Sequence, residues 1–196
     1  FWSGAEAFTE NQKRDLLSSR MRNKFSTVSS WDVLEPIWNR FQGKAWAPTH
    51  LNWMSYLDLN IRLPELLLMR VDKMCMGVSL EGRVPFLDHR FVEFSMSIPE
   101  EMKTRGGILK YILKKSVQDV IPREIIDREK QGFVVPVHDW FFDRLGTKTR
   151  EVLQAFCRET DFLDIGAVSR WMDRGRGSQT WYLLNLALWH EKYIAS

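Results

Sequence analysis

The chain has 196 residues, a formal net charge of +3 and 44% hydrophobic residues, which is typical of a globular protein with a sizeable core. The small net charge, without Lys and Arg gathered on one face, argues against a nucleic-acid-binding protein. No apolar run is long enough to span a bilayer, and no basic segment followed by an apolar one marks a signal peptide. We therefore expect a cytoplasmic protein that binds neither nucleic acid nor membrane.

Helical signals dominate the first half of the chain, where apolar residues recur at intervals of three and four. Thr9 and Ser30 stand where a side-chain oxygen caps a helix, and Pro64 stands where a proline opens one. The helix that follows Pro64 is apolar on both faces, so we expect it to be buried. The predicted helices are residues 8–17, 31–41 with a kink at Pro36, 49–59 and 64–80.

The second half also predicts helices, separated by Gly- and Pro-containing loops. No repeat and no strand pair is visible, so the predicted fold class is all-α. The large aromatic side chains should be mostly buried, because exposure of so many rings favours aggregation. The predicted helices are residues 88–97, 108–120, 122–127, 137–144, 148–158, 166–174 and 178–194, and the rings expected in the core include Trp31, Trp38, Trp181 and Trp189.

Cysteine and histidine give no metal-site signal. Cys75 and Cys157 lie far apart, with no other metal-binding residue at ligand spacing, which indicates two reduced thiols. The four histidines are isolated as well. The first residue is Phe1 rather than Met, from which we expect the sequence to be a piece of a longer protein.

Charged residues crowd into one otherwise apolar stretch, from Arg70 to Arg90. Burying charges is costly unless they pair or bind a ligand, and helical spacing puts Asp72 beside apolar side chains. One interpretation is an internal ion-pair network such as Asp72–Arg83. The other is a site where carboxylates hold Mg²⁺ or move a proton while basic side chains meet phosphate oxygens. Walker A, GxGxxG, HExxH, GxSxG and CxxC motifs are all absent from the sequence.

The same stretch, LPELLLMRVDKMCMGVSLEGRVPFLDHRFVEF from Leu63 to Phe94, resembles the signature of glutamine-hydrolysing asparagine synthetases. The resemblance continues through KYILKK at 110–115, PREIIDREKQGFVVP at 122–136, Trp140 and the final TWYLLNLALWHEKY. It covers residues 56–196 well and residues 1–55 only loosely. Helix periodicity does not explain about a dozen identical positions at fixed spacing.

The resemblance implies that residues 1–196 are a single helical fragment, the C-terminal portion of an α/β ATP-pyrophosphatase-type synthetase domain. The central sheet, the SGGxDS ATP loop and the N-terminal glutaminase domain of that family are not in this sequence. Members adenylate a carboxylate with ATP and Mg²⁺, and ammonia released from glutamine then displaces AMP. We expect aspartate or a related carboxylate as the acceptor, an inactive isolated chain, and a homodimer as one assembly to test.

The family motifs assign roles residue by residue, and a structural role is the alternative for each. The resemblance makes Glu81 and Lys130 catalytic, Arg128 and Lys110 nucleotide- or pyrophosphate-binding, Asp88 a Mg²⁺ ligand, and Asp72 and Arg83 structural supports. Lys73 and Cys75 depart mildly from the family, which often has Arg and Ser there.

Two other functions stay open. Relatives with this signature amidate other acceptors, namely peptides or sugar acids, or close β-lactam rings. A non-catalytic helical interaction module, with its Trp-rich C-terminal helix as a partner surface, is the alternative from another class. For the synthetase fragment we expect an exposed apolar or charged surface near Arg70–Asp88, where the nucleotide and the missing sheet would pack.

Overall fold

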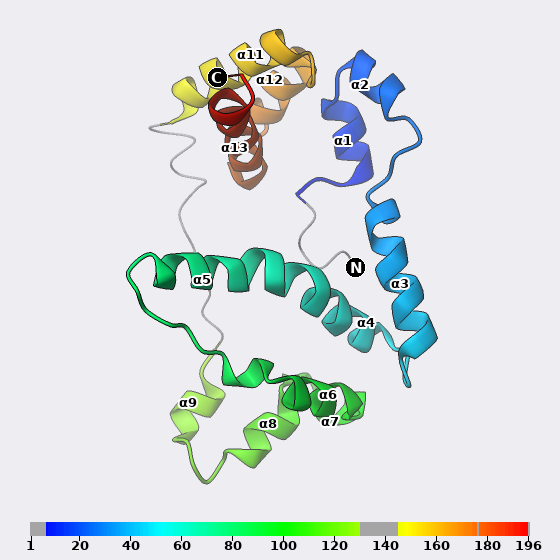
Figure 1. Cartoon of the computed structure of the whole chain (residues 1–196), viewed down its shortest axis with the longest axis vertical. Coiled ribbons are helices and arrows are strands. Elements are labelled where there is room, and N and C mark those ends of the chain that lie inside the picture. The colour runs from blue at the N-terminus through cyan, green and yellow to red at the C-terminus, as the bar shows by residue number, and fades with distance from the viewer. Residues whose placement is uncertain (1–6, 130–144, 176, 196) are drawn as a thin grey trace. The chain divides into compact units, whose positions relative to one another are not determined.

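The computed structural model describes residues 7–129, 145–175 and 177–195, and helices dominate these ranges, as the all-α prediction required (Figure 1). The chain divides into two compact units. We call the one with described residues 34–129 the motif unit, because it contains the Leu63–Phe94 signature. The other, with residues 7–33, 145–175 and 177–195, is the terminal unit. None of the described helices is long and apolar enough to cross a membrane.

The terminal unit builds its core from segments far apart in the sequence. Backbone bonds join Ser18 N to Phe162 O (3.0 Å) and Asp164 N to Leu16 O (2.8 Å). Burial raises the pKa of the Cys157 thiol to about 11, and both cysteines are free thiols, as predicted. The helices are α1 (Glu10–Leu16), α2 (Ser19–Lys24), α11 (Gly146–Thr160), α12 (Ile165–Asp173) and α13 (Gly177–Tyr193), and the buried core comprises Leu16, Leu153, Phe156, Cys157, Leu163, Val168, Trp171, Leu183 and Ala187.

The predicted cap at Thr9 is confirmed and the one at Ser30 is not. Thr9 accepts a hydrogen bond from Gln12 N, and the Gln12 side chain accepts one from Thr9 N, which completes a capping box. Ser30 instead binds α1: its N–H donates to Glu10 Oε1 (2.9 Å), and its hydroxyl accepts from Lys13. The carboxylate of Glu10 therefore joins the first helix to the segment that leads into α3 (Trp31–Lys44).

This arrangement predicts a pH-dependent contribution to stability from Glu10. The ion pair with Lys13 (2.9 Å), followed by the Ser30 N–H, lowers the Glu10 pKa from 4.5 to about 2. A depressed folded-state pKa adds stability above the unfolded-state value, and the gain is lost as pH falls from about 4.5 to about 2. Glu10→Gln should cost on the order of 1 kcal/mol at neutral pH, since both partners are partly solvated, and almost nothing at pH 2.

Urea unfolding at a series of pH values measures this difference. Glu151→Gln is the matched control, because Glu151 forms a longer, more exposed pair with Lys148 (3.7 Å) in the same unit. Its cost should stay within about 0.5 kcal/mol at every pH. A Glu10→Gln difference that does not shrink below pH 4 would contradict the assignment.

In the motif unit the buried core is small. Leu34, Phe41, Trp53 and Leu57 form it, with the Trp38 and Tyr56 rings packed against it. The helices are α3, α4 (His50–Leu57), the π-helix η1 (Asp58–Leu68), α5 (Met69–Met76), the 3-10 turn η2 (Pro85–Leu87), α6 (His89–Ser97), α7 (Glu100–Lys103), α8 (Tyr111–Ser116) and α9 (Arg123–Asp127).

Pro64 does not begin a helix, contrary to the sequence prediction. It lies inside η1, and α4, η1 and α5 follow one another without a break from His50 to Met76 (Figure 1). A proline inside an α-helix removes a hydrogen bond and clashes with the preceding turn. The wider i→i+5 pattern of the π-helix is the local adjustment at this position. Pro36 likewise lies inside α3.

The prediction that residues 64–80 form a buried helix is also wrong. None of the described residues from 58 to 129 is fully buried, and Met74 and Val78 are each 76% exposed. Three of the four tryptophans predicted to be buried are exposed as well, namely Trp31, Trp181 and Trp189, and Trp38 is partly buried. Apolar periodicity identified these apolar surfaces, but the described residues do not cover them.

One short strand pair corrects the expectation of none. Strands β1 (Thr104–Arg105) and β2 (Ile108–Leu109) pair antiparallel, so α8 begins later than predicted. Gly106 and Gly107 both have positive φ, +56° and +79°, which a two-residue hairpin turn of this type requires. The helix predicted over 137–144 lies outside the described residues.

Candidate functional site

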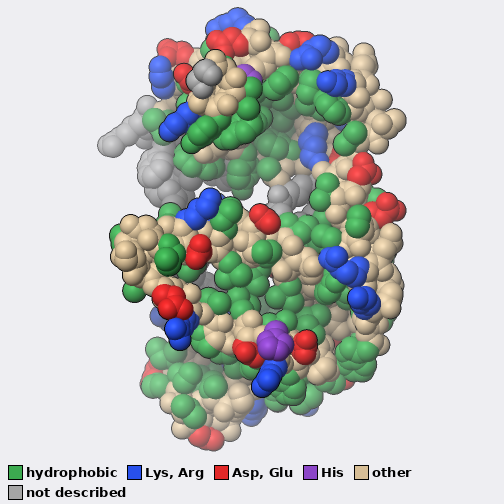
Figure 2. Space-filling model, in the orientation of Figure 1, with side chains coloured by type: hydrophobic (Ala, Val, Ile, Leu, Met, Phe, Trp, Pro, Cys, Tyr) green, Lys and Arg blue, Asp and Glu red, His purple; other side chains and the backbone are tan. Residues whose placement is uncertain are grey.

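The signature segment from Leu63 to Phe94 covers the end of η1, α5, a return loop at residues 77–84, η2 and most of α6. Its apolar side chains are largely exposed. Figure 2 shows hydrophobic side chains on the surface along α5, with acidic and basic side chains among them. The expected exposed surface near Arg70–Asp88 is therefore present.

A helix-ending motif sets the course of the return loop. Leu80 N donates to Cys75 O (2.9 Å) and Ser79 N donates to Met76 O (3.0 Å), which is the bond pair of a Schellman motif. Its left-handed position is filled by Ser79, with φ +58°, where glycine is the usual residue. The loop then lies against α5, because a Cβ on Gly82 would stand 3.1 Å from Val71 Cγ1 and 3.6 Å from Cys75 Sγ.

Glu81 pairs with Arg83, not with a partner on α5. Arg83 donates through Nε to Oε1 (2.9 Å) and through Nη2 to Oε2 (3.2 Å), so each carboxylate oxygen receives one bond. The Asp72–Arg83 pair suggested by the sequence does not form, and Asp72 is exposed rather than in apolar surroundings. The reason is that no other segment of the described chain buries the α5 face on which Asp72 lies.

Asp88 acts as a helix cap in this structure. Its Oδ1 accepts hydrogen bonds from Arg90 N (3.0 Å) and Phe91 N (3.3 Å) at the start of α6. Within the described ranges, no three His, Cys, Asp or Glu side chains are grouped so as to hold a metal ion. The role of Asp88 as a Mg²⁺ ligand stays a prediction, because Mg²⁺ is often held by one or two carboxylates together with substrate phosphates.

The structure does not bring the basic candidates to Glu81. Lys110 precedes α8 in a left-handed conformation, φ +57°, and lines an open groove of about 950 Å³ together with Phe86 and Leu87. Arg128 is exposed at the end of α9. Among residues 7–129, no hydrogen bond or ion pair joins Glu81 to Asp88, Lys110 or Arg128. Lys130 lies outside the described residues.

Lys103 has features that sequence reasoning missed. Its Nζ donates to Asn52 Oδ1 (2.9 Å) and Met96 O (3.3 Å), which connects α7 with α4 and α6. Burial lowers the pKa of Lys103, and Glu100 partly opposes that effect. The side chain also lines the groove that contains Lys110. The only sequence signal near Lys103 is the glycine pair of the segment MKTRGG, which marks a tight turn. That signal does not predict that Lys103 connects α7 with α4 and α6.

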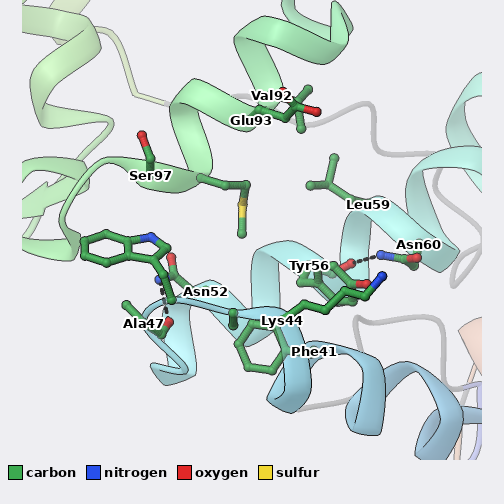
Figure 3. A pocket seen from close by; sticks show the side chains of 13 residues that line it. Phe41, Lys44, Ala47, Asn52, Tyr56, Leu59, Asn60, Val92, Glu93 and Ser97 are labelled. Atoms are coloured by element: carbon green, nitrogen blue, oxygen red, sulfur yellow. Dashed lines mark hydrogen bonds between the residues drawn. The ribbon is translucent and has the colours of Figure 1, made fainter.

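A second, smaller pocket of about 390 Å³ lies between α3, α4, η1 and α6 (Figure 3). Its two asparagine side chains bond to backbone carbonyls of the lining: Asn52 Nδ2 donates to Ala47 O (2.9 Å) and Asn60 Nδ2 donates to Tyr56 O (2.8 Å). None of the predicted site residues lines it. The pocket is a separate feature of the motif unit.

The family model described as asparagine synthase matches residues 2–191. The chain belongs to the asparagine synthase family. The match includes the first 55 residues, for which the signature motifs gave only a loose resemblance. This is a family of ligase enzymes.

Curated relatives agree with the family match. Asparagine synthetase [glutamine-hydrolyzing] 1 of Bacillus subtilis is 32% identical over 150 residues, which is 76% of this chain and 22% of that protein. A putative asparagine synthetase [glutamine-hydrolyzing] of Mycobacterium tuberculosis is 28% identical over 99% of this chain and 29% of its own length. The human asparagine synthetase [glutamine-hydrolyzing] is 43% identical over 68 residues, 12% of its length. The chain thus spans less than a third of these relatives, and no solved structure matches it significantly.

Proposed function

We propose that this chain is the C-terminal helical part of the synthetase domain of a longer asparagine-synthetase-type enzyme. The observation that carries the proposal is the exposed family signature: Leu63–Phe94 forms helices and a fixed loop, yet no described residue from 58 to 129 is fully buried. A segment that folds locally without a core of its own is suited to packing against another part of a protein.

The proposed reaction has two steps. The acceptor carboxylate, for which aspartate is the leading candidate, attacks the α-phosphorus of ATP and forms an acyl-adenylate with release of pyrophosphate. Ammonia from glutamine then attacks the acyl carbon, and AMP leaves as the amide forms. We place this reaction in the cytoplasm, with ATP accompanied by Mg²⁺.

Each candidate residue has a physical role in this scheme. Glu81 would orient the incoming ammonia and accept its proton, because its carboxylate is exposed at the fixed loop. Lys130 would neutralise charge on the departing pyrophosphate, with Arg128 and Lys110 as further phosphate contacts. Within the described residues, Asp72 forms no ion pair that would stabilise the segment. A supporting role for Asp72 would therefore depend on contacts with other parts of the longer enzyme.

The test compares the isolated 196-residue chain with the longer protein that contains it. Incubation with ATP, Mg²⁺, aspartate and ammonia should yield AMP and asparagine from the longer protein, and no AMP above background from the isolated chain. The longer protein could instead make AMP but no asparagine. If an amide product then forms when another carboxylate replaces aspartate, that carboxylate is the acceptor. Robust AMP formation by the isolated chain would refute the fragment proposal, and none from the longer protein with any carboxylate tested would refute the synthetase proposal.

The non-catalytic interaction module keeps one supporting observation. Helix α13 exposes Trp189 and Tyr193, 51% and 64% respectively, which is a large aromatic surface for a terminal helix. A longer protein that folds, forms a complex through α13 and makes no AMP would favour the interaction module over the synthetase.

A further inference from the structure

The ion pair between Glu81 and Arg83 constrains the orientation of the Glu81 carboxylate as well as its distance from Arg83. Two parallel contacts, Nε to Oε1 and Nη2 to Oε2, join the planar guanidinium to the planar carboxylate. A bidentate arrangement fixes the plane of the carboxylate, whereas a single contact leaves it free to rotate. The contacts also leave further lone pairs on both oxygens available as acceptors.

The backbone that carries the pair is itself held in place. Gly82, between the two residues, lies so close to α5 that an added Cβ would stand 3.1 Å from Val71 Cγ1. The left-handed Ser79 and the Leu80 N to Cys75 O bond fix the start of the same loop. The position of Glu81 therefore comes from the loop, and its orientation comes from Arg83.

We propose that Arg83 is a positioning residue for Glu81 in amide formation: it holds the carboxylate plane so that the remaining lone pairs accept the N–H groups of the incoming ammonia. This inference rests on the proposed function. It goes beyond a general supporting role, because Arg83 then acts through one carboxylate and not through the stability of the segment.

The exposure of the two side chains makes it possible to distinguish a role of Arg83 in positioning Glu81 from a role in stabilising the segment. The side chains of Arg83 and Glu81 are 81% and 69% exposed, and exposed ion pairs contribute little to folding stability. In the isolated chain, replacing Arg83 should therefore leave the melting temperature nearly unchanged. A loss of turnover without a loss of stability is the signature of positioning.

A double-mutant cycle in the longer synthetase provides the test. Arg83→Met should lower kcat for amide formation about tenfold or more, and Arg83→Lys should recover part of that loss, because lysine keeps the charge but not the fork. In a Glu81→Gln background, Arg83→Met should change kcat by less than about twofold, since the group it orients is altered. Arg123→Met is the control: Arg123 forms a similarly exposed pair with Asp127 (3.2 Å) and its loss should leave kcat unchanged.

If the factors by which the two single substitutions lower kcat multiply in the double variant, Arg83 and Glu81 act independently. That result would overturn the inference and leave the proposed function standing. So would equal turnover by the Arg83→Met and wild-type enzymes. Absence of AMP formation by the wild-type longer protein would instead overturn the proposed function and, with it, this role for Arg83.

Discussion

Replacing Glu81 with glutamine in the longer synthetase is expected to lower amide formation by about a hundredfold or more, with glutamine hydrolysis almost unchanged. Glutamine keeps the size of the side chain and one acceptor oxygen but removes the charge. Glutamine hydrolysis takes place in another domain of the proposed enzyme, so it should not depend on this carboxylate. Formation of the amide product and of glutamate, measured on one preparation, report the two reactions.

Glu101→Gln is a matched control for this substitution. Glu101 is an exposed residue of α7 in the same unit, with no assigned role, so its turnover should equal that of the wild type. In the isolated chain, where both residues are exposed, the melting temperatures of both variants should stay within about 2 °C of the wild type, since exposed substitutions change stability little. A folded Glu81→Gln enzyme with near-normal synthetase turnover would remove Glu81 from the catalytic assignment.

The second large effect concerns the core of the motif unit. Leu57 is 0% exposed and packs with Leu34, Phe41 and Trp53 in a small buried cluster. Leu57→Ala should cost about 2–5 kcal/mol, because the removed methyl groups lose their burial and leave a cavity. Urea unfolding followed by tryptophan fluorescence measures the loss, since Trp53 lies in the cluster itself.

The control is the same change at an exposed leucine of the continuous helix. Leu67 is 47% exposed, and alanine is the better helix former, so Leu67→Ala should cost less than about 1 kcal/mol in the isolated chain. Equal costs at the two positions would show that the four-residue cluster is not the stabilising core of this unit.

Local chemistry made several helix ends predictable from the sequence. The Thr9 cap and the α6 start at Asp88 depend on side chains that bond backbone groups two or three residues away. Ser30 differs because its hydroxyl, the group that would cap α3, accepts a hydrogen bond from Lys13, seventeen residues earlier. The Gly106–Gly107 hairpin was readable in principle, since paired glycines favour its turn.

Burial was the property that the sequence did not determine. The apolar pattern of residues 64–80 fits a covered helix, but periodicity does not say whether the covering segment belongs to the same chain. The candidate site shows the same limit. The family motif located Glu81 and Arg83, whereas their bidentate contact depends on the Ser79 and Gly82 backbone, which no periodic pattern encodes.

The π-helix at Asp58–Leu68 has a consequence for the direction in which the signature faces. Each i→i+5 bond encloses one more residue than an α-helical bond, so side chains after η1 are rotated about the axis relative to an uninterrupted α-helix. In an uninterrupted α-helix, residues of α4 and α5 whose sequence separation suits the helical repeat would lie on one face. Across η1 the same residues point in different directions. The π-helix therefore rotates the faces of α5 relative to those of α4, whose Trp53 and Leu57 lie in the core.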